Sequence, residues 1–296
     1  MTDIDITFAA VSDVGLARSS NEDAFELTDL STGTHFGTSP TQGQFGVGDR
    51  GVLLTLSDGM GGHAAGEVAA AVVVTSVRHT LLDDSTASGA QRLEAAVRRA
   101  NVDVRNAAQS KGRLGMGATL TAVLVDAGTA YIAEVGDSRA YLLRSGQLKQ
   151  LTRDQSLVQA LVDNGMMAQE EAEHSAQKNI LLQAMGSASD VQAALGQVSL
   201  RRGDKLLLCS DGVSNAIAHD ELCELLAANG PWPACAHMIQ LANQRGGEDN
   251  LTAVVALFEG GGLAAARPSE TVTATFSVLR DFGPAPKSEH EALAGG

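Results

Sequence analysis

Short apolar runs bounded by glycine-containing turns recur along the chain and predict β-strands. The run from Val52 to Leu56 ends at Asp58-Gly59, which is the pattern of a buried strand that passes into a turn. Four further runs follow one another closely enough to form a β-meander, at residues 118–125, 130–135, 140–144 and 147–151. Later strands are predicted at residues 205–209 and 251–258.

Longer stretches before and after the meander have the periodicity of helices. Residues 64–82 contain no proline and predict one helix, and residues 219–228 and 233–244 predict two more. A further helix is predicted over residues 91–110, whose apolar side chains fall on one helical face. These are Leu93, Val97, Ala100 and Val104.

The order of these elements favours an α+β fold. Consecutive antiparallel strands with helices before and after them predict packed layers rather than a parallel sheet. The polar stretch 154–185 interrupts the strands and predicts a helical insertion, while the Gly- and Thr-rich residues 31–51 predict a long loop. We expect one domain over residues 1–259, followed at 260–296 by a disordered tail rich in Gly, Ala and Pro.

Composition and charge narrow the range of partners. Of the 296 residues 44% are hydrophobic, enough for a sizeable core, and the net charge is −14. Such an acidic chain is a poor ligand for nucleic acid or for an anionic membrane surface, because both bind through Lys and Arg. The longest small-apolar run, residues 69–74, is too short to cross a bilayer.

The three cysteines indicate a reducing compartment. Cys209, Cys223 and Cys235 form no CxxC pair, so they predict neither a disulfide framework nor a zinc site. The N-terminal residues are acidic and lack the basic and apolar regions of a signal peptide. We therefore expect a cytoplasmic protein, and we expect it to be monomeric.

Acidic residues stand repeatedly at the ends of predicted strands. Asp58, Asp137 and Asp211 each lie at or after the end of a strand beside a glycine, and Asp249 directly precedes another strand. Any one of them could be an ordinary Asx turn. Several strands that deliver carboxylates to one sheet edge would instead build a site for hard cations such as Mg²⁺ or Mn²⁺.

A glycine pattern elsewhere carries no comparable signal. Residues 46–51 match GxGxxG, but a dinucleotide-binding loop follows a strand and opens a helix. Here a predicted loop precedes the glycines and a strand follows them, so the pattern does not predict a nucleotide site.

An ordered set of motifs resembles the metal-dependent protein phosphatase family, also called type 2C. It begins at residues 18–24 with Arg-Ser-Ser-Asn-Glu-Asp-Ala and continues at 58–67 with Asp-Gly-Met-Gly-Gly-His-Ala-Ala-Gly-Glu. The remaining motifs follow in the order of the family and the resemblance extends over about residues 5–258. They are Gly-Met-Gly-Ala-Thr-Leu (115–120), Gly-Asp-Ser-Arg-Ala (136–140), Ser-Asp-Gly (210–212) and Gly-Glu-Asp-Asn (247–250).

The resemblance implies a fold, a cofactor and a reaction. The fold is two antiparallel sheets packed in a sandwich and flanked by helices, a four-layer αββα arrangement with a helical flap at about residues 152–186. The reaction is the hydrolysis of phosphoserine and phosphothreonine in proteins by a water that bridges two Mn²⁺ or Mg²⁺ ions.

The resemblance also implies a role for each matching residue. Asp58 would bridge both ions and be central to catalysis, the Gly59 carbonyl would bind the first, and Asp211 and Asp249 the second. Arg18 would hold the substrate phosphate and share in catalysis. Three side chains would support the ligands: Glu22 and Asp23 as acceptors for metal-bound waters, and Asn250 by orienting Asp249.

Three departures from the family pattern bear on the mechanism. Met60 stands where animal members carry a histidine proposed as the acid for the leaving group, and the nearest histidine is His63. Gln155 replaces the histidine of a common Asp-His-Ser sequence. Asn215 stands where many relatives have an aspartate, so a third metal beside Asp137 and Asp211 is expected to be weak or absent.

The resulting expectation is a bacterial-type serine/threonine phosphatase that acts on phosphorylated proteins and opposes a serine/threonine kinase. Two alternatives remain open at this point. One is a non-catalytic phosphoprotein-binding module of the same fold, which intact Asp58, Asp211 and Asp249 disfavour. The other is a hydrolase of small phosphoesters.

Overall fold

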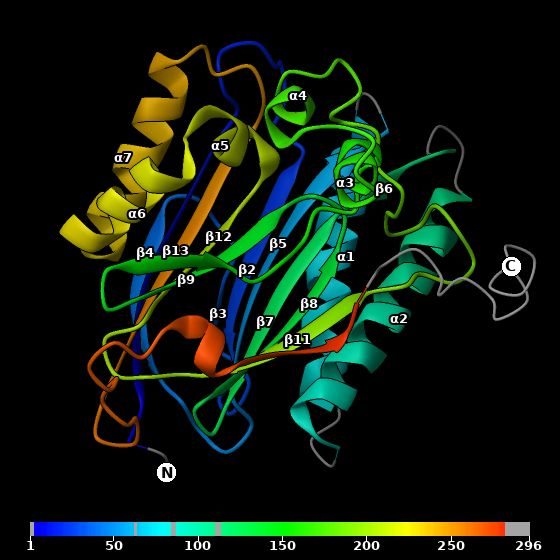
Figure 1. The fold of residues 1–296 in the computed structure, drawn as a ribbon. Helices are drawn as coiled ribbons and strands as arrows, with labels where there is room; N and C mark the ends of the chain where they lie inside the picture. The colour runs from blue at the N-terminus through cyan, green and yellow to red at the C-terminus, as the bar shows by residue number, and fades with distance from the viewer. Residues whose placement is uncertain (1–2, 62–63, 84–86, 110–113, 282–296) are drawn as a thin grey trace, which may run out of the picture.

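The computed structural model describes residues 3–61, 64–83, 87–109 and 114–281 of the chain (Figure 1). Two antiparallel β-sheets pack face to face, and helices cover the outer face of each sheet. This succession of helix, sheet, sheet and helix confirms the predicted α+β sandwich.

The six-stranded sheet brings the two ends of the domain together, because the N-terminal β1 pairs with β13 along its whole length. Its strand order is β10-β9-β12-β13-β1-β4. The strands are β1 (Asp5–Asp13), β4 (Thr41–Gly46), β9 (Arg139–Arg144), β10 (Gln147–Gln150), β12 (Lys205–Cys209) and β13 (Leu251–Glu259).

The eight-stranded sheet is built around β5, whose two faces are both buried. Leu54 and Leu56 face the other sheet and Leu53 faces the helices, which explains the continuous apolar run. The order is β14-β11-β8-β7-β5-β2-β3, with β6 paired to the end of β5. The strands are β2 (Asp23–Asp29), β3 (His35–Phe36), β5 (Val52–Met60), β6 (Gly117–Ala118), β7 (Leu120–Asp126), β8 (Thr129–Val135), β11 (Ala194–Ser199) and β14 (Phe276–Arg280).

Two long helices cover the eight-stranded sheet, and three shorter ones cover the other. The predicted apolar face of α2 is buried as expected, and a capping box of Ser88 and Gln91 begins this helix. The helices are α1 (Ala64–Asp83) and α2 (Gly89–Ala108) on one side, and α5 (Asp211–Ala216), α6 (His219–Ala228) and α7 (Pro231–Gln244) on the other.

The helix α1 is packed inside the domain. Residues 65–83 have a mean hydropathy of 1.2, so by length and composition this segment could span a membrane. Half of it is buried, and Ala69, Val73 and Val77 belong to the core shared with α2 and the eight-stranded sheet. Its apolar character is therefore that of a core helix.

The helical insertion contains α3 (Leu157–Asp163) and α4 (Gln169–Glu173), which lie over one end of the sheets (Figure 1). Gln155 ties its start to the strand end, because its side-chain oxygen accepts a hydrogen bond from Gly136 N at 3.0 Å. Ser156 then caps α3 by accepting a hydrogen bond from Gln159 N. We call residues 152–186 the flap.

The expectation of a long loop at residues 31–51 was wrong, because β3 and β4 lie within it. β4 pairs with β1 as an edge strand of the six-stranded sheet. Its sequence, Thr-Gln-Gly-Gln-Phe-Gly, carries one large apolar side chain, Phe45, which packs on Phe8. A single anchoring aromatic is too weak a pattern to predict a strand.

The expectation of a disordered tail was wrong for residues 260–281. Leu263 and Val272 are buried in the core between the sheets, and β14 pairs with β11. Glu270 lies 2.7 Å from Arg201, and Thr275 accepts a hydrogen bond from the buried Arg144. Single buried side chains hold this segment in place, so its sequence shows no regular pattern of apolar residues. Residues 282–296 lie outside the described residues.

Candidate metal centre

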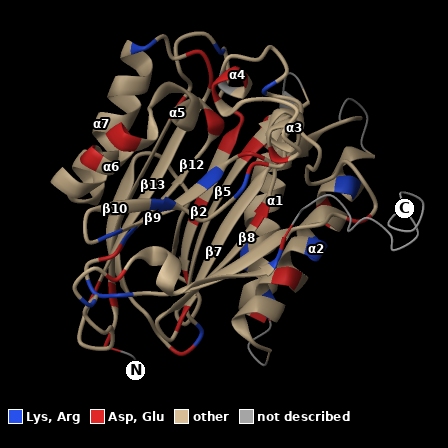
Figure 2. Ribbon diagram, viewed as in Figure 1, with Lys and Arg blue, Asp and Glu red and all other residues tan. Residues whose placement is uncertain are grey.

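Acidic residues gather at one end of the two sheets, near the flap (Figure 2). Asp58 lies near the end of β5, and it pairs across the sheet with Asp23 at the start of β2. Asp137 follows the strand β8 and is separated from it by one glycine. The eight-stranded sheet therefore brings these carboxylates to the same edge.

The six-stranded sheet contributes two further carboxylates. Asp211 begins α5 just after β12, and Asp249 lies just before β13. Because β12 and β13 are antiparallel neighbours, the end of one lies beside the start of the other. Asp211 and Asp249 consequently lie at one edge of the sheet.

All four strand-end aspartates predicted from the sequence line one pocket of about 400 Å³. They are joined there by the residues expected to bind substrate or to complete the metal shell. The lining includes Arg18, Glu22, Asp58, Gly59, Met60, Thr119, Asp137, Asp211, Asp249 and Asn250.

Burial and mutual repulsion raise the pKa values of these acids. Burial is the main reason that the pKa of Asp58 lies well above its usual value, and Asp23 and Asp211 raise it further. Burial likewise raises the pKa of Asp23 to about 7 and that of Asp211 to about 6. The pKa of Asp137 is raised well above its usual value by burial and by Asp211. These carboxylates would be stabilised by positive charge.

The donor set fits hard divalent cations. Asp23 Oδ1 and Asp211 Oδ1 are buried without a hydrogen-bond partner among the described residues, and all the acidic ligands are oxygen donors. Asp58 and Asp211 hydrogen-bond to each other, so they are close enough to share an ion. No three described His, Cys, Asp or Glu side chains stand ready as a metal site, so the carboxylates would have to draw inward around an ion.

Two hydroxyl groups position Asp23. Its Oδ2 atom accepts hydrogen bonds from Ser210 Oγ at 2.8 Å and from Thr252 Oγ1 at 2.6 Å. These bonds leave Asp23 Oδ1 without a hydrogen-bond partner among the described residues, and Asp23 lies behind the residues that line the pocket rather than among them. Sequence reasoning missed both hydroxyls; Ser210 adjoins Asp211 in the Ser-Asp-Gly motif, which is the one signal that points to it.

A second pair of hydroxyls links the neighbourhoods of Asp58 and Asp137. Thr119 Oγ1 accepts a hydrogen bond from Asp58 N at 2.9 Å, and it shares another with Ser138 Oγ at 2.8 Å. Ser57 Oγ donates to the Thr119 carbonyl. Thr119 and Ser138 lie within matched motifs, but their roles were not predicted.

Asn250 holds together the segment that carries Glu22. Its Oδ1 atom accepts a hydrogen bond from Glu22 N, and its amide group donates to the carbonyls of Val14 and Ser20. Its backbone N–H donates to Asp249 Oδ1 at 2.9 Å, as expected of a residue that orients Asp249.

Glycine is required close to Glu22. A Cβ atom on Gly66 would collide with the Glu22 carboxylate, and one on Gly59 would collide with the Gly66 carbonyl. The tight approach of α1 to the end of β5 therefore depends on two residues without side chains.

Arg18 lies at the mouth of the pocket with half of its side chain exposed. One guanidinium nitrogen is 2.8 Å from Asp249 Oδ2, and this hydrogen bond is the main reason that the pKa of Arg18 is raised. The remaining donors of the guanidinium are available at the rim, where an anionic ligand would enter.

Asn215 lies beside Asp211, as the expected third-metal position requires. Its Nδ2 atom donates to Asp211 Oδ2 at 3.3 Å, and a small adjoining cavity is lined by Asp137, Asp211 and Asn215. Met60 lines the main pocket. His63 lies outside the described residues.

The cysteines take no part in the pocket. Cys209 and Cys235 are buried, and burial raises the pKa of each thiol to about 12. Thiols in this state are poor nucleophiles at neutral pH. Cys223 lies on α6, and it does not line the pocket.

The sequence and the fold are those of a known family. The profile described as Protein phosphatase 2C matches residues 39–256. The chain belongs to the protein phosphatase 2C family, and the resemblance inferred from the motifs is confirmed.

Its relatives are bacterial phosphatases. It is 38% identical over 254 residues to the serine/threonine protein phosphatase PstP of Mycobacterium tuberculosis, an alignment that covers 85% of this chain and 45% of PstP. It thus spans about half the length of that relative. It is 36% identical to the serine/threonine phosphatase stp of Listeria monocytogenes, covering 72% of this chain and 87% of that protein.

A solved structure of PstP shows what this fold can bind. The catalytic domain of PstP in complex with 2 manganese ions superposes with a TM-score of 0.72 and 35% identity. The superposition covers 86% of this chain and 99% of that one. The four-layer fold is therefore shared with a manganese-binding phosphatase domain.

Proposed function

We propose that this chain is a Mn²⁺- or Mg²⁺-dependent phosphatase that hydrolyses phosphoserine and phosphothreonine in proteins. The observation that carries the proposal is the pocket in which Asp58, Asp137, Asp211 and Asp249 meet from separate strand ends. Buried oxygen atoms without partners and raised pKa values support metal binding there. The two manganese ions of the PstP domain support the same conclusion.

Different residues of the chain would bind the metal ions, the phosphate group and the waters. Asp58, the Gly59 carbonyl, Asp211 and Asp249 would hold two ions, which supply an activated water and neutralise charge on the phosphoryl group. Arg18 at the rim would bind the phosphate oxygens and orient the phosphorus atom toward the carboxylates. Glu22 and Asp23 would accept hydrogen bonds from waters in the pocket.

The cellular setting follows from the same reasoning. The relatives named serine/threonine phosphatases support a role against a serine/threonine kinase. Free cysteines, two of them buried, are compatible with a reducing cytoplasm. The intact acidic ligands favour an enzyme over a binding module of the same fold.

Phosphate release from a phosphothreonine peptide, measured with and without Mn²⁺, tests this function. Wild-type protein should release phosphate only with the metal, and should prefer the peptide to a sugar phosphate. Asp58→Ala should abolish phosphate release while the protein stays folded. Asp190→Ala changes an exposed aspartate that does not line the pocket, and it should not affect phosphate release. Metal-independent release, or full activity of Asp58→Ala, would refute the proposal.

A further inference from the structure

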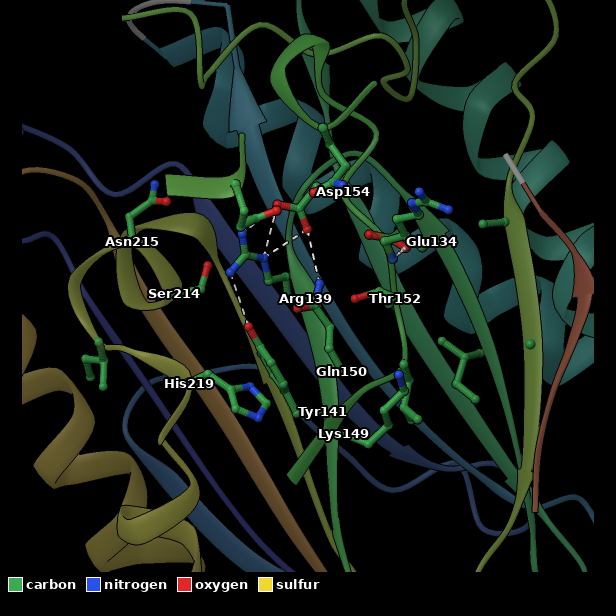
Figure 3. A pocket seen from close by; sticks show the side chains of 18 of the residues that line it. Glu134, Arg139, Tyr141, Lys149, Gln150, Thr152, Asp154, Ser214, Asn215 and His219 are labelled. Carbon is green, nitrogen blue, oxygen red and sulfur yellow. Dashed lines mark hydrogen bonds and ion pairs between the residues drawn. The ribbon is translucent and has the colours of Figure 1, made fainter. Parts of the chain in front are cut away.

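A second cavity lies beside the metal centre and is larger than it. We call it the lateral groove; its volume is about 860 Å³, and it lies between β9, β10, the flap and β14 (Figure 3). Its lining includes Arg139, Lys149, Lys178, Asn215, Val278 and Arg280.

The lateral groove adjoins the pocket of the carboxylates. The small cavity between them is lined by Asp137 and Asp211, which also line the metal pocket. It is lined as well by Arg139, Lys178 and Asn215, which also line the lateral groove. The groove and the metal centre are therefore separated by no more than the residues that line this small cavity.

Two lysines of the groove form no close ion pair with any described residue. Lys149 on β10 is exposed, whereas Lys178 on the flap is half-buried and its charge favours the ionised form of Asp211. Arg280 is also cationic, although it is paired with Glu94. In a chain of net charge −14, this concentration of positive charge is local.

The acidic lining residues contribute little opposing charge. Asp154 is bound by Arg139 through two hydrogen bonds to one guanidinium (Figure 3), and Glu221 is bound by Arg245. Glu134 is buried, and burial holds its pKa well above its usual value, which disfavours its charged form. Asp281 alone among the described acidic residues of the lining has no such partner.

One wall of the groove is formed by the strand β14. Phe276, Val278 and Arg280 on alternate positions of β14 line it, and Val278 is 59% exposed. This strand lies beyond the family match, which ends at residue 256. The groove is therefore shaped in part by a segment that follows the matched residues.

We propose that the lateral groove binds the acidic polypeptide that flanks the phosphorylated residue of a protein substrate. The proposal rests on the proposed function and adds a preference for acidic flanks. The groove adjoins the metal centre and so lies within reach of the flank, the exposed Lys149 attracts its carboxylates, and the strand β14 supplies an apolar contact through Val278.

The test compares two phosphothreonine peptides, one with acidic and one with neutral flanks, and p-nitrophenyl phosphate, which is too small to reach the groove. Lys149→Glu should lower kcat/KM about tenfold for the acidic peptide, mainly through KM, since reversing one charge near a carboxylate has this order of effect. Lys149→Arg keeps the positive charge and should therefore retain the wild-type kcat/KM for the acidic peptide. Hydrolysis of p-nitrophenyl phosphate should be unchanged.

Two further variants distinguish a contact in the groove from a change in the overall charge of the protein. Val278→Glu should weaken the acidic peptide in the same way, whereas Arg105→Glu, a charge reversal on the exposed face of α2, should leave both peptides unaffected. Equal losses for both peptides, or no loss in Lys149→Glu, would overturn the proposal. If no substrate is hydrolysed, the proposed function fails, and fluorescence anisotropy of the labelled acidic peptide still tests the groove: binding that Lys149→Glu does not weaken overturns it.

Discussion

The crowded aspartates make the metal-free protein sensitive to pH in a calculable direction. The pKa of Asp23 is about 7 in the folded protein against a usual 3.8, so between these values the folded state binds more protons than the unfolded state. Stability therefore falls as the pH rises through this window. A shift of about three units corresponds to about 4 kcal/mol, a large part of a typical 5–15 kcal/mol.

Thermal unfolding followed by circular dichroism in EDTA measures this loss. About two of these units lie between about pH 5 and about pH 8, which corresponds to about 3 kcal/mol, so we expect the melting temperature to be about 5–10 °C lower at the higher pH. Asp23→Asn retains an oxygen acceptor for Ser210 and Thr252 but cannot ionise, so its melting temperature should depend much less on pH. Excess Mn²⁺ should restore the wild type at the higher pH, because the ionised carboxylates would bind it. Equal pH dependence in the two proteins would refute the reasoning.

Three further predictions concern the surroundings of the site. Thr119→Val removes the acceptor of Asp58 N and should raise the Mn²⁺ concentration needed for half-maximal phosphate release, whereas Thr119→Ser should not; equal metal dependence would contradict a positioning role. Asn215→Asp adds a carboxylate beside Asp211 and should shift the same titration to lower Mn²⁺, so an unchanged curve would mean that this position binds no third ion. Leu263→Ala should cost about 2–5 kcal/mol in chemical denaturation, because the side chain is buried, while the exposed Leu279→Ala should be nearly neutral; equal stabilities would contradict a packed 260–281 segment.

The strands that carry the aspartates could be predicted because their signals are local. Val52 to Leu56 is apolar because both faces of β5 are buried, and Asp58-Gly59 marks its end. The matching motifs then gave each aspartate a place in a known order. Local pattern and family resemblance together were therefore sufficient for the fold and for the acidic pocket.

The supporting hydroxyl groups could not be found in the same way. Asp23 is held by Thr252, which is 229 residues away in the sequence, and Thr119 is 61 residues from Asp58. A serine or threonine within a strand is common, and only the register of the sheets shows which one meets a carboxylate. The tail was misjudged for a related reason, since Leu263 and Val272 are isolated anchors without a repeating pattern.

The pairing of β1 with β13 has a consequence for biosynthesis. The strand β1 can pair early with β4, but its other side stays unpaired until β13, nearly the last strand of the domain, has been made. Asp249 immediately precedes β13. A nascent chain consequently lacks part of its metal ligand set until almost the whole domain has been translated. Incomplete translation products would be unable to assemble the centre, so premature termination would yield inert fragments rather than unregulated hydrolases.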